Sequence, residues 1–370
     1  MSEERRVRDP IHGFIRLSGD EADLIETPVF QRLRGIRQLA MANMVYPGAL
    51  HTRFDHTLGV FHVTSLLCDV FKFSDEDKRL VRLSALVHDL GHGPFSHVSE
   101  GALEIFADRE KLKDRLKGDN AAKIHELLTQ DLLNSDEDLK HLIGGSTISK
   151  IISLLSHGYG EPILRSVVSG PLDADKQDYL LRDSYFCGVN YGIFDLQQLH
   201  RELQSQEDPT DGKHQLVISE DGVHALEQFV LAKYYLTAQE TVRDITKPKN
   251  WGIRRKLEQE LAEVIQKAGF PLKCCCKDAS NFVIVYSYTQ KSVRAQSRND
   301  EGPILVRKGS KVTTFEEAST LFQSIDEKMV RPDFALYAPV EHGNPSERRI
   351  MENKLIEPIL KCLEGFGNGK

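Results

Sequence analysis

Residues 83–97 read LSALVHDLGHGPFSH and place three histidines and an aspartate at the end of a segment whose apolar spacing is typical of a core-facing helix. Ser74 can cap this helix with Asp77 three residues later, and the glycines and proline of residues 91–94 can stop it. The apolar face repeats through Leu80, Leu83, Val87 and Leu90. The quoted stretch is therefore the end of a helix.

The polar residues of this stretch need partners, because burying an unpaired polar group costs roughly 1–3 kcal/mol. On a helical wheel His88 borders the apolar stripe and Asp89 points about 100° further round, so both can face one interior pocket. They belong either to a hydrogen-bonded core network or to a metal site. A His-Asp pair alone favours the hydrogen-bonded network over the metal site. Other segments of the chain shift the preference toward the metal site.

The composition is that of a globular intracellular protein. The 370 residues are 40% hydrophobic, and the net charge of -7 argues against general coating of nucleic acid while leaving room for a local basic cleft. The start of the chain lacks the apolar region of a secretory signal, and no stretch approaches the ~18 apolar residues of a membrane span. The cysteines read as reduced thiols, with metal ligation by Cys274 to Cys276 as the less favoured alternative. We expect a soluble, cytoplasmic protein without a membrane contact.

The chain is expected to be mainly α. From residue 20 to about 245 the apolar spacing is mostly helical, with a turn-rich connection at 204–212. Beyond it the pattern predicts a helix at 254–268, strands at 282–288 and 303–306, and a helix start at Thr314 with Glu317. We therefore expect a helical core, residues 1–245, followed by a small C-terminal α+β lobe, residues 246–370.

Four segments carry side chains that can bind a metal or a phosphate. They read HTRFDHTLG at 51–59, HDLGHGPFSH at 88–97, IHELL at 124–128 and DADKQDYLLRDS at 173–184. In the last, helical spacing puts on one side Asp175, Tyr179 and Asp183, flanked by Lys176 and Arg182. Imidazole and carboxylate ligands with an open position suit Mn, Fe, Zn or Mg-like ions, which polarise phosphoryl oxygens. These segments favour a metal site for the opening stretch.

His56, the pair His88-Asp89 and Asp175 form an H…HD…D pattern that resembles the signature of the HD-domain phosphohydrolase superfamily. The surrounding sequence is similar to its dNTP triphosphohydrolase branch, through DPIHGFIRL, FQRLRGIRQL, YPGALHTRFDHTLGV, HDLGHGPFSH and DADKQDYLLRDS. The resemblance covers about residues 8–239, and no sterile-alpha-motif-like region is expected before it. It implies that the helical core is an HD domain.

The resemblance also implies the ligands of the site. One divalent metal, Mn, Fe, Mg or Zn, would be held by His56, His88, Asp89 and Asp175, with additional Mg²⁺ accompanying the triphosphate. Substrate contacts would come from Gln38, Leu39, Arg53, Lys176, Tyr179 and Asp183. Arginine and lysine suit this role because a triphosphate needs several positive charges. The alternatives are salt bridges of Arg53 and Lys176 to Asp55 or Asp178, and core packing for Leu39.

The implied reaction is attack of water on the α-phosphorus of a dNTP, which yields a deoxynucleoside and inorganic triphosphate. The leaving 5′ oxygen needs a proton, and His92, Glu100 and His125 match the acid-base positions of the family. Histidine suits this step because its ordinary pKa is about 6.5. Core packing is the alternative for His125. The remaining histidines considered are expected to be structural: His51, His62, His97 and His157.

Some members of the family form tetramers when GTP or dGTP binds between subunits, through a segment that here reads TPVFQRLRGIRQL. Gln31 and Arg34 match guanine-contacting positions, and Glu26 stands where an aspartate is expected. We therefore expect a homo-oligomer with a nucleotide effector, and ordinary surface hydrogen bonds are the alternative. After residues 231–239 the sequence departs from the family, because ETVRDITKPKN replaces the usual Tyr-x-His pattern. Lys233 is the candidate to take the place of a phosphate-binding arginine of the family.

Three functions remain open at this point. The leading one is a dNTP triphosphohydrolase. The second is an HD-domain phosphohydrolase that acts on another nucleotide phosphate ester. The third is a non-catalytic member that binds a nucleotide or nucleic acid.

Overall fold

The structure is a computed structural model that describes residues 4–96, 124–156, 161–240, 284–289, 303–325 and 332–337, with Glu263 and Lys267. The chain divides into two compact units, residues 1–244 with 291–329 and residues 245–290 with 330–370. Residues 291–329, expected in the C-terminal lobe, thus group with the first unit. Some expectations fall outside the described residues: Glu100, His97, His157, Cys274 to Cys276 and most of the helix at 254–268.

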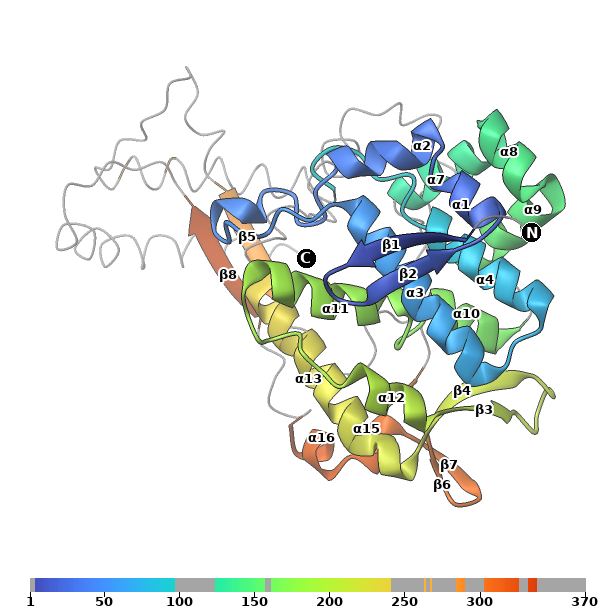
Figure 1. The fold of residues 1–370 in the computed structure, drawn as a ribbon. Coiled ribbons are helices and arrows are strands. Elements are labelled where there is room, and N and C mark those ends of the chain that lie inside the picture. The colour runs from blue at the N-terminus through green and yellow to red at the C-terminus, as the bar shows by residue number, and fades with distance from the viewer. Residues whose placement is uncertain are drawn as a thin grey trace. The chain divides into compact units, whose positions relative to one another are not determined.

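Helices dominate the first unit (Figure 1). The longer ones are α3 (Arg53–Phe71), α4 (Asp75–Val87), α7 (Ile124–Ser135), α9 (Gly145–Leu155), α11 (Ala174–Cys187) and α13 (Val223–Glu240). The shorter α-helices are α1 (Asp20–Leu24), α2 (Pro28–Gln31), α8 (Glu137–Ile143), α10 (Pro162–Val168), α12 (Leu196–Glu202), α15 (Phe315–Ala318) and α16 (Thr320–Ile325). Three 3₁₀ turns join them: η1 (Arg32–Gly35), η2 (Ala42–Met44) and η3 (Glu220–Gly222). The expected mainly α chain with a small α+β part toward its C-terminal end is confirmed.

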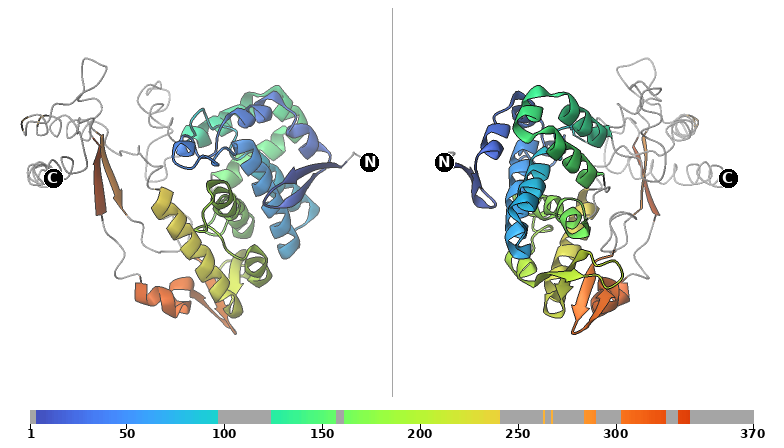
Figure 2. Two further views of the ribbon diagram at one scale, coloured as in Figure 1. Left: turned by 60° about the vertical axis from the view of Figure 1, so that its left-hand side comes forward. Right: turned by 90° about the vertical axis from the view of Figure 1, so that its right-hand side faces the viewer.

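The described strands form three small sheets. An antiparallel hairpin pairs β1 (Arg5–Asp9) with β2 (Gly13–Leu17), and in the second unit β5 (Ile284–Thr289) pairs with β8 (Pro332–Tyr337). The four-stranded sheet has the order β3 (Leu203–Glu207), β4 (His214–Ser219), β6 (Leu305–Lys308) and β7 (Lys311–Thr314) (Figure 2). Its β4 and β6 run parallel, with Val217 opposite Leu305.

The strands β3 and β4 correct the expectation of a turn-rich connection at 204–212. Residues 204–207 belong to β3, and only the tip between Glu207 and His214 is a turn. The strand β4 gains a second partner in β6, far along the chain, and buries Leu216 to Ile218. A local sequence pattern does not reveal such a partner, because strand preference depends on what packs beside the strand.

The helix α4 begins where its sequence predicts and ends at Val87, three residues before Leu90, the last residue of the predicted apolar face. Ser74 is its N-cap, and the Ser74 Oγ accepts a hydrogen bond from the backbone N–H of Asp77 at 3.1 Å. The last helical residue is Val87, so His88 stands at the C-cap position. An N-cap bond of this kind stabilises a helix by about 1 kcal/mol.

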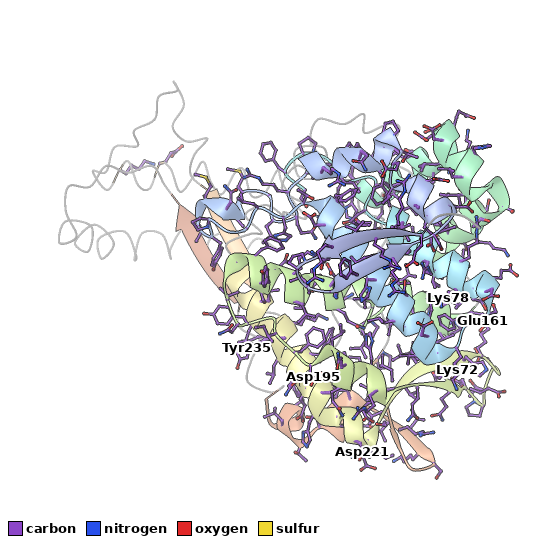
Figure 3. All side chains as sticks on the ribbon, viewed as in Figure 1. Lys72, Lys78, Glu161, Asp195, Asp221 and Tyr235 are labelled. Carbon is purple, nitrogen blue, oxygen red and sulfur yellow. The ribbon has the colours of Figure 1, made fainter. Side chains whose placement is uncertain are left out.

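The helix α3 is delimited by equally local signals. Thr52 and Asp55 form a capping box at its start, and Lys72 ends it in a left-handed conformation with φ 52°. Figure 3 labels Lys72 and Lys78 at the corner between α3 and α4, where Lys78 pairs with Asp69 at 2.6 Å. The caps fix the ends of α3 and α4, and the ion pair between Lys78 and Asp69 links the two helices at this corner.

The hydrophobic core lies where α3 packs against both α4 and α11. Phe61, Leu67, Leu83 and Leu86 are almost completely buried there. Burying one such side chain contributes about 1.5–3 kcal/mol, so the three helices form a rigid frame for polar groups between them. Within the described part of the chain, no helix is long and apolar enough to cross a membrane. The cytoplasmic location stays a prediction.

Candidate metal centre and active site

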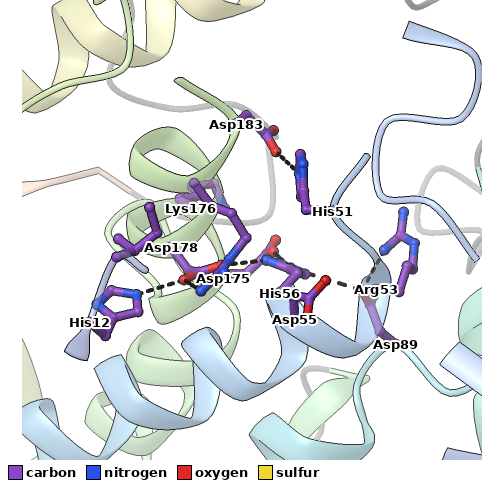
Figure 4. A network of polar contacts seen from close by, with 12 residues as sticks. His12, His51, Arg53, Asp55, His56, Asp89, Asp175, Lys176, Asp178 and Asp183 are labelled. Atoms are coloured by element: carbon purple, nitrogen blue, oxygen red, sulfur yellow. Dashed lines mark hydrogen bonds and ion pairs between the residues drawn. The ribbon is translucent and has the colours of Figure 1, made fainter. Parts of the chain in front are cut away.

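Four residues expected as metal ligands meet where α3, α11 and the end of α4 approach one another (Figure 4). His56 Nε2 lies 2.9 Å from Asp175 Oδ1 and 3.9 Å from Asp89 Oδ2. His88 Nε2 lies 3.4 Å from Asp89 Oδ1. The ligand atoms of His56, His88 and Asp175 are all within 4.8 Å of one another. Two imidazoles and the carboxylate of Asp175 at this spacing can hold a divalent cation, and Asp89 lies beside both imidazoles without belonging to this group of three.

The imidazole of His88 is oriented as a metal ligand requires. Its Nδ1 lies 2.7 Å from the carbonyl oxygen of Ala85, which only accepts, so Nδ1 carries the proton and Nε2 of the neutral ring offers a lone pair. His88 Nε2 is buried and has no hydrogen-bond partner among the described residues. An orphaned buried acceptor is costly unless it is satisfied, and a cation beside Asp89 satisfies it. The donor set therefore fits a divalent metal.

His56 is held between two carboxylates. Its Nδ1 lies 2.8 Å from Asp178 Oδ2, and its Nε2 faces Asp175. Burial lowers the pKa of His56, but the hydrogen bonds and charges of Asp175 and Asp178 outweigh it and raise that pKa to about 10. For Asp175, burial raises the pKa, and His56 more than reverses this. A divalent cation can take the place of the proton between His56 and Asp175.

Arg53 begins α3 and points into the same centre (Figure 4). Its guanidinium hydrogen-bonds Asp89 Oδ2 and the hydroxyl of Ser96, and only 3% of the arginine is exposed. Burial raises the pKa of Asp89, but the charges of Arg53 and then His88 hold it well below its ordinary value. The alternative of a salt bridge to Asp55 is wrong, since Asp55 caps α3 instead.

Lys176 lies on α11, next to Asp175. Its Nζ donates to Asp173 Oδ2 and to the carbonyl oxygen of Gly170, each at 2.8 Å. The described ion pair of Lys176 is therefore with the residue that caps α11, and the alternative of a pair with Asp178 is wrong.

Arg182 lies two turns after Asp175 on the same side of α11, as helical spacing predicts, and its partners are carboxylates of the protein itself. It is fully buried and pairs with Asp178, one turn earlier, and with Asp9 of β1. Burial raises the pKa of Asp178, but Arg182 and the neighbouring histidines keep it well below its ordinary value. Asp178 is thus a charged partner of the expected ligand His56 that sequence reasoning missed. The sequence signal that could have identified Asp178 is its position three residues after Asp175.

Two of the three expected acid-base residues lie together. The rings of His92 and His125 stack with centroids 3.9 Å apart, and His92 Nε2 is 3.4 Å from Asp89 Oδ1. Burial, followed by the charge of Arg53, holds the pKa of His92 well below its ordinary value. His92 is therefore neutral near pH 7. Glu100 lies outside the described residues.

Gly91 makes the approach of His92 to α7 possible. A β-carbon at Gly91 would stand 1.9 Å from the carbonyl oxygen of His125, closer than any real contact. The Gly91 N–H donates to Thr129 Oγ1 at 2.9 Å and ties the loop to the helix. The glycine in HDLGHG is therefore required by packing.

Asp183, expected to contact substrate, faces a histidine that was expected to be structural. His51 Nε2 lies 2.7 Å from Asp183 Oδ1, and the His51 ring stacks on Phe186 with centroids 4.7 Å apart. Both His51 and Asp183 are buried. His51 thus supports a predicted substrate residue, and its place in HTRFDH, five residues before His56, was the only sequence signal.

The other expected substrate contacts differ in their surroundings. Leu39 is buried but is not part of the main hydrophobic core. The Oε1 of Gln38 is buried without a hydrogen-bond partner among the described residues. Tyr179 is half-buried and packs on the core, one turn after Asp175. Lys233 is half-buried on α13.

The expected effector residues lie on α2, η1 and the turn before them. Arg34 Nε donates to Gln31 Oε1 at 2.8 Å, and the Arg34 guanidinium lies 3.5 Å from the ring centroid of Phe54. Glu26 pairs with Arg5 of β1 at 2.6 Å. Gln31 and Arg34 are therefore in contact, while Glu26 pairs with the N-terminal hairpin.

The chain resembles known proteins across the region that carries these residues. Residues 53–178 match the family model described as HD domain. Over 256 residues the chain is 32% identical to the uncharacterized protein YwfO of Bacillus subtilis, covering 67% of this chain and 54% of that protein. Over 208 residues it is 35% identical to the human deoxynucleoside triphosphate triphosphohydrolase SAMHD1, covering 50% of this chain and 33% of that protein. The chain spans about half the length of the first curated relatives it matches.

Two solved structures share the fold. A hypothetical protein from Aquifex aeolicus superposes with a TM-score of 0.66 at 25% identity, covering 96% of this chain and all of that one. A phosphohydrolase from Bacteroides thetaiotaomicron superposes with a TM-score of 0.67 at 22% identity, covering 92% of this chain and all of that one. The family model and the curated relatives confirm the resemblance stated from the sequence motifs.

Proposed function

We propose, on the premise that this chain is an HD-domain protein, that it hydrolyses deoxynucleoside triphosphates to deoxynucleosides and inorganic triphosphate. The observation that carries the proposal is the meeting of His56, His88, Asp89 and Asp175 from three separate elements, with Arg53 beside them. The relatives named as deoxynucleoside triphosphate triphosphohydrolases support the choice of substrate.

A divalent metal bound to these ligands would polarise a phosphoryl oxygen and lower the pKa of water. Arg53 and Lys176 would then bind the triphosphate, since both cations are buried close to the ligand residues. His125, stacked on His92, would donate the proton that the 5′ oxygen needs. Glu100 stays a sequence-based candidate for the same step.

The sugar would be held by Gln38, Leu39, Tyr179 and Asp183. The buried Gln38 Oε1 accepts no hydrogen bond from the described residues, so a sugar hydroxyl can satisfy it. Leu39 and Tyr179 would leave no space for a 2′ hydroxyl and so favour deoxyribose. The preferred base is left open.

The decisive experiment incubates the full chain with each dNTP and Mn²⁺ or Mg²⁺ and identifies the product by ion-exchange chromatography. Intact triphosphate supports the proposal. Inorganic phosphate or pyrophosphate instead would indicate a hydrolase of another phosphate ester, and binding without turnover would indicate a non-catalytic member. His88→Ala and Asp89→Ala should abolish turnover, while Lys78→Ala, at a surface ion pair, should leave it unchanged.

The metal is proposed to be Mn, Fe, Mg or Zn, with one ion per site, and elemental analysis of the purified protein identifies it. A homo-oligomer, such as a tetramer assembled by GTP or dGTP at Glu26, Gln31 and Arg34, is the proposed regulated form. The contact between Gln31 and Arg34 supports this proposal, because two adjacent polar side chains can read the edge of a guanine.

A further inference from the structure

The turn of the N-terminal hairpin reaches the metal centre through a single carboxylate (Figure 4). His12 follows β1, and its Nε2 lies 2.7 Å from Asp178 Oδ1. The other oxygen of that carboxylate, Oδ2, lies 2.8 Å from His56 Nδ1. The exposed fractions of these side chains are 3% for His12, 0% for Asp178 and 1% for His56. Three buried groups from distant parts of the sequence therefore form one chain of hydrogen bonds.

We infer that His12 is a positioning residue of the metal centre, which holds Asp178 so that Asp178 fixes the ring of His56. The inference rests on the proposed role of His56 as a metal ligand. An ionised carboxylate only accepts hydrogen bonds, so both rings present an N–H to Asp178. His56 Nδ1 is thereby the protonated nitrogen, and His56 Nε2 is left for the metal. Such outer partners set the orientation and basicity of a ligating histidine.

The turn that carries His12 is itself clamped to α11. Asp9 Oδ1 accepts from the backbone N–H groups of Ile11 at 2.9 Å and His12 at 2.8 Å. Asp9 Oδ2 accepts from Arg182 NH1 at 2.8 Å. The same guanidinium donates to both oxygens of Asp178 at 2.8 and 2.9 Å. Arg182 thus fixes the turn and the carboxylate relative to each other.

The helix α3 leaves space for this arrangement at Gly59, which lies one turn after His56. A β-carbon there would stand 1.9 Å from Asp178 Oδ1 and 2.3 Å from Arg182 NH2. Asp178 therefore reaches His56 over the bare backbone of α3. Without His12, Oδ1 would keep only Arg182 NH2 among its described partners, so Arg182 and His56 alone would set the orientation of the carboxylate.

The test measures Co²⁺ binding to the full chain, through its dissociation constant and its visible absorption spectrum. His12→Leu removes the donor to Asp178 and should weaken Co²⁺ binding about tenfold, the lower end of the effects seen for partners of ligands. The spectrum should change because the ligand ring is no longer fixed. His12→Gln places an amide N–H near the original Nε2 and should restore affinity to within about threefold of the wild type.

His200→Leu is the matched control. His200 is also buried and also donates its Nε2 to α11, at 2.6 Å from Gln177 Oε1, but Gln177 contacts none of the metal ligands in any described hydrogen bond. The control loses a similar bond and should bind Co²⁺ as the wild type does. A general loosening of α11 would instead weaken Co²⁺ binding in both leucine variants and would overturn the inference.

A double-mutant cycle with Asp178→Asn tests the route. Because His12 acts through Asp178, His12→Leu should cause no further loss in the Asp178→Asn background. Additive losses, or wild-type affinity of His12→Leu, would overturn the inference. If His12→Leu does not fold, His12→Asn takes its place, since the asparagine side chain is too short for its amide to reach Asp178. A wild type that binds no metal would refute the proposed function itself, which separates the two failures.

Discussion

Replacing Gly59 with alanine perturbs the closest approach between α3 and α11. The added β-carbon would stand 1.9 Å from Asp178 Oδ1 and 2.3 Å from Arg182 NH2, whereas ordinary contacts of a β-carbon begin at 3.4 Å. The two helices must therefore separate by about 1.5 Å, or the ion pair must leave its place. Neither atom is the free end of a flexible chain, because Asp178 and Arg182 are fully buried.

The cost follows from two contributions. Overpacking a well-packed core costs about 1–3 kcal/mol. Complete loss of one partner of a buried ion pair costs about 3–5 kcal/mol, of which a separation of the helices causes only part. We expect Gly59→Ala to lower the free energy of unfolding by about 3 kcal/mol, which at 2–4 °C per kcal/mol lowers the melting temperature by about 6–12 °C.

The assay is thermal unfolding followed by circular dichroism, with the metal content measured on the same samples. Gly145→Ala is the control, because a β-carbon on the first residue of α9 meets no atom within 4 Å. It should leave stability unchanged or raise it by about 0.4–1 kcal/mol. Since the separation also draws Asp178 away from His56, Gly59→Ala should lose metal as well. A Gly59→Ala protein with the melting temperature and metal content of the wild type would refute the reasoning.

Three further predictions concern pH, metal and nucleotide. Burial, and then the charge of His62, lowers the pKa of His200 to about 4, so the ring stays neutral in the folded protein. The free energy of unfolding is therefore full above pH ~6.5, the pKa of the unfolded chain, and falls as the pH drops toward 4. At pH 5 the loss should be about 2 kcal/mol, and His200→Gln should reduce the difference in unfolding free energy between pH 7 and 5 measured by urea titration. Removing metal with EDTA should lower the melting temperature, and Mn²⁺ at a hundredfold excess over its dissociation constant should restore about 2.7 kcal/mol; an EDTA-insensitive melting curve contradicts a metal centre. Adding dGTP should increase the molecular mass seen by light scattering in the wild type but not in Arg34→Ala, and equal responses would exclude Arg34 from the effector site.

The parts of the fold that the sequence predicted are those with local signals. The helix α4 begins at the Ser74 cap and ends before the glycines of HDLGHG, because capping and helix termination depend on a few adjacent residues. The four proposed ligands came instead from the resemblance of the H…HD…D pattern to a known family. Their meeting in space was implied by the resemblance, and the helical periodicity of the chain alone does not give it.

The parts that the sequence did not predict depend on distant partners. Helical spacing placed Arg182 on the Asp175 side of α11, but it did not reveal that the arginine pairs with Asp9 of the N-terminal hairpin as well as with Asp178. The pairing of β4 with β6 was missed because the two strands lie far apart in the sequence. His12 could not be assigned at all, since its partner lies 166 residues further along the chain.

The charges of the centre bear on the order in which its ligands bind. Arg53 already pairs with Asp89, and Lys176 with Asp173, so the two cations proposed to bind the triphosphate are partly neutralised by carboxylates. Asp175 adds a further negative charge that His56 balances only while that ring is protonated. A triphosphate brought to these residues alone would meet at least as many carboxylates as cations, and like charges in a buried site repel strongly. A divalent cation between His56, His88 and Asp175 reverses this balance, because it replaces one proton with two positive charges. Under the proposed function, the carboxylates that would hold the metal therefore also make nucleotide binding depend on it.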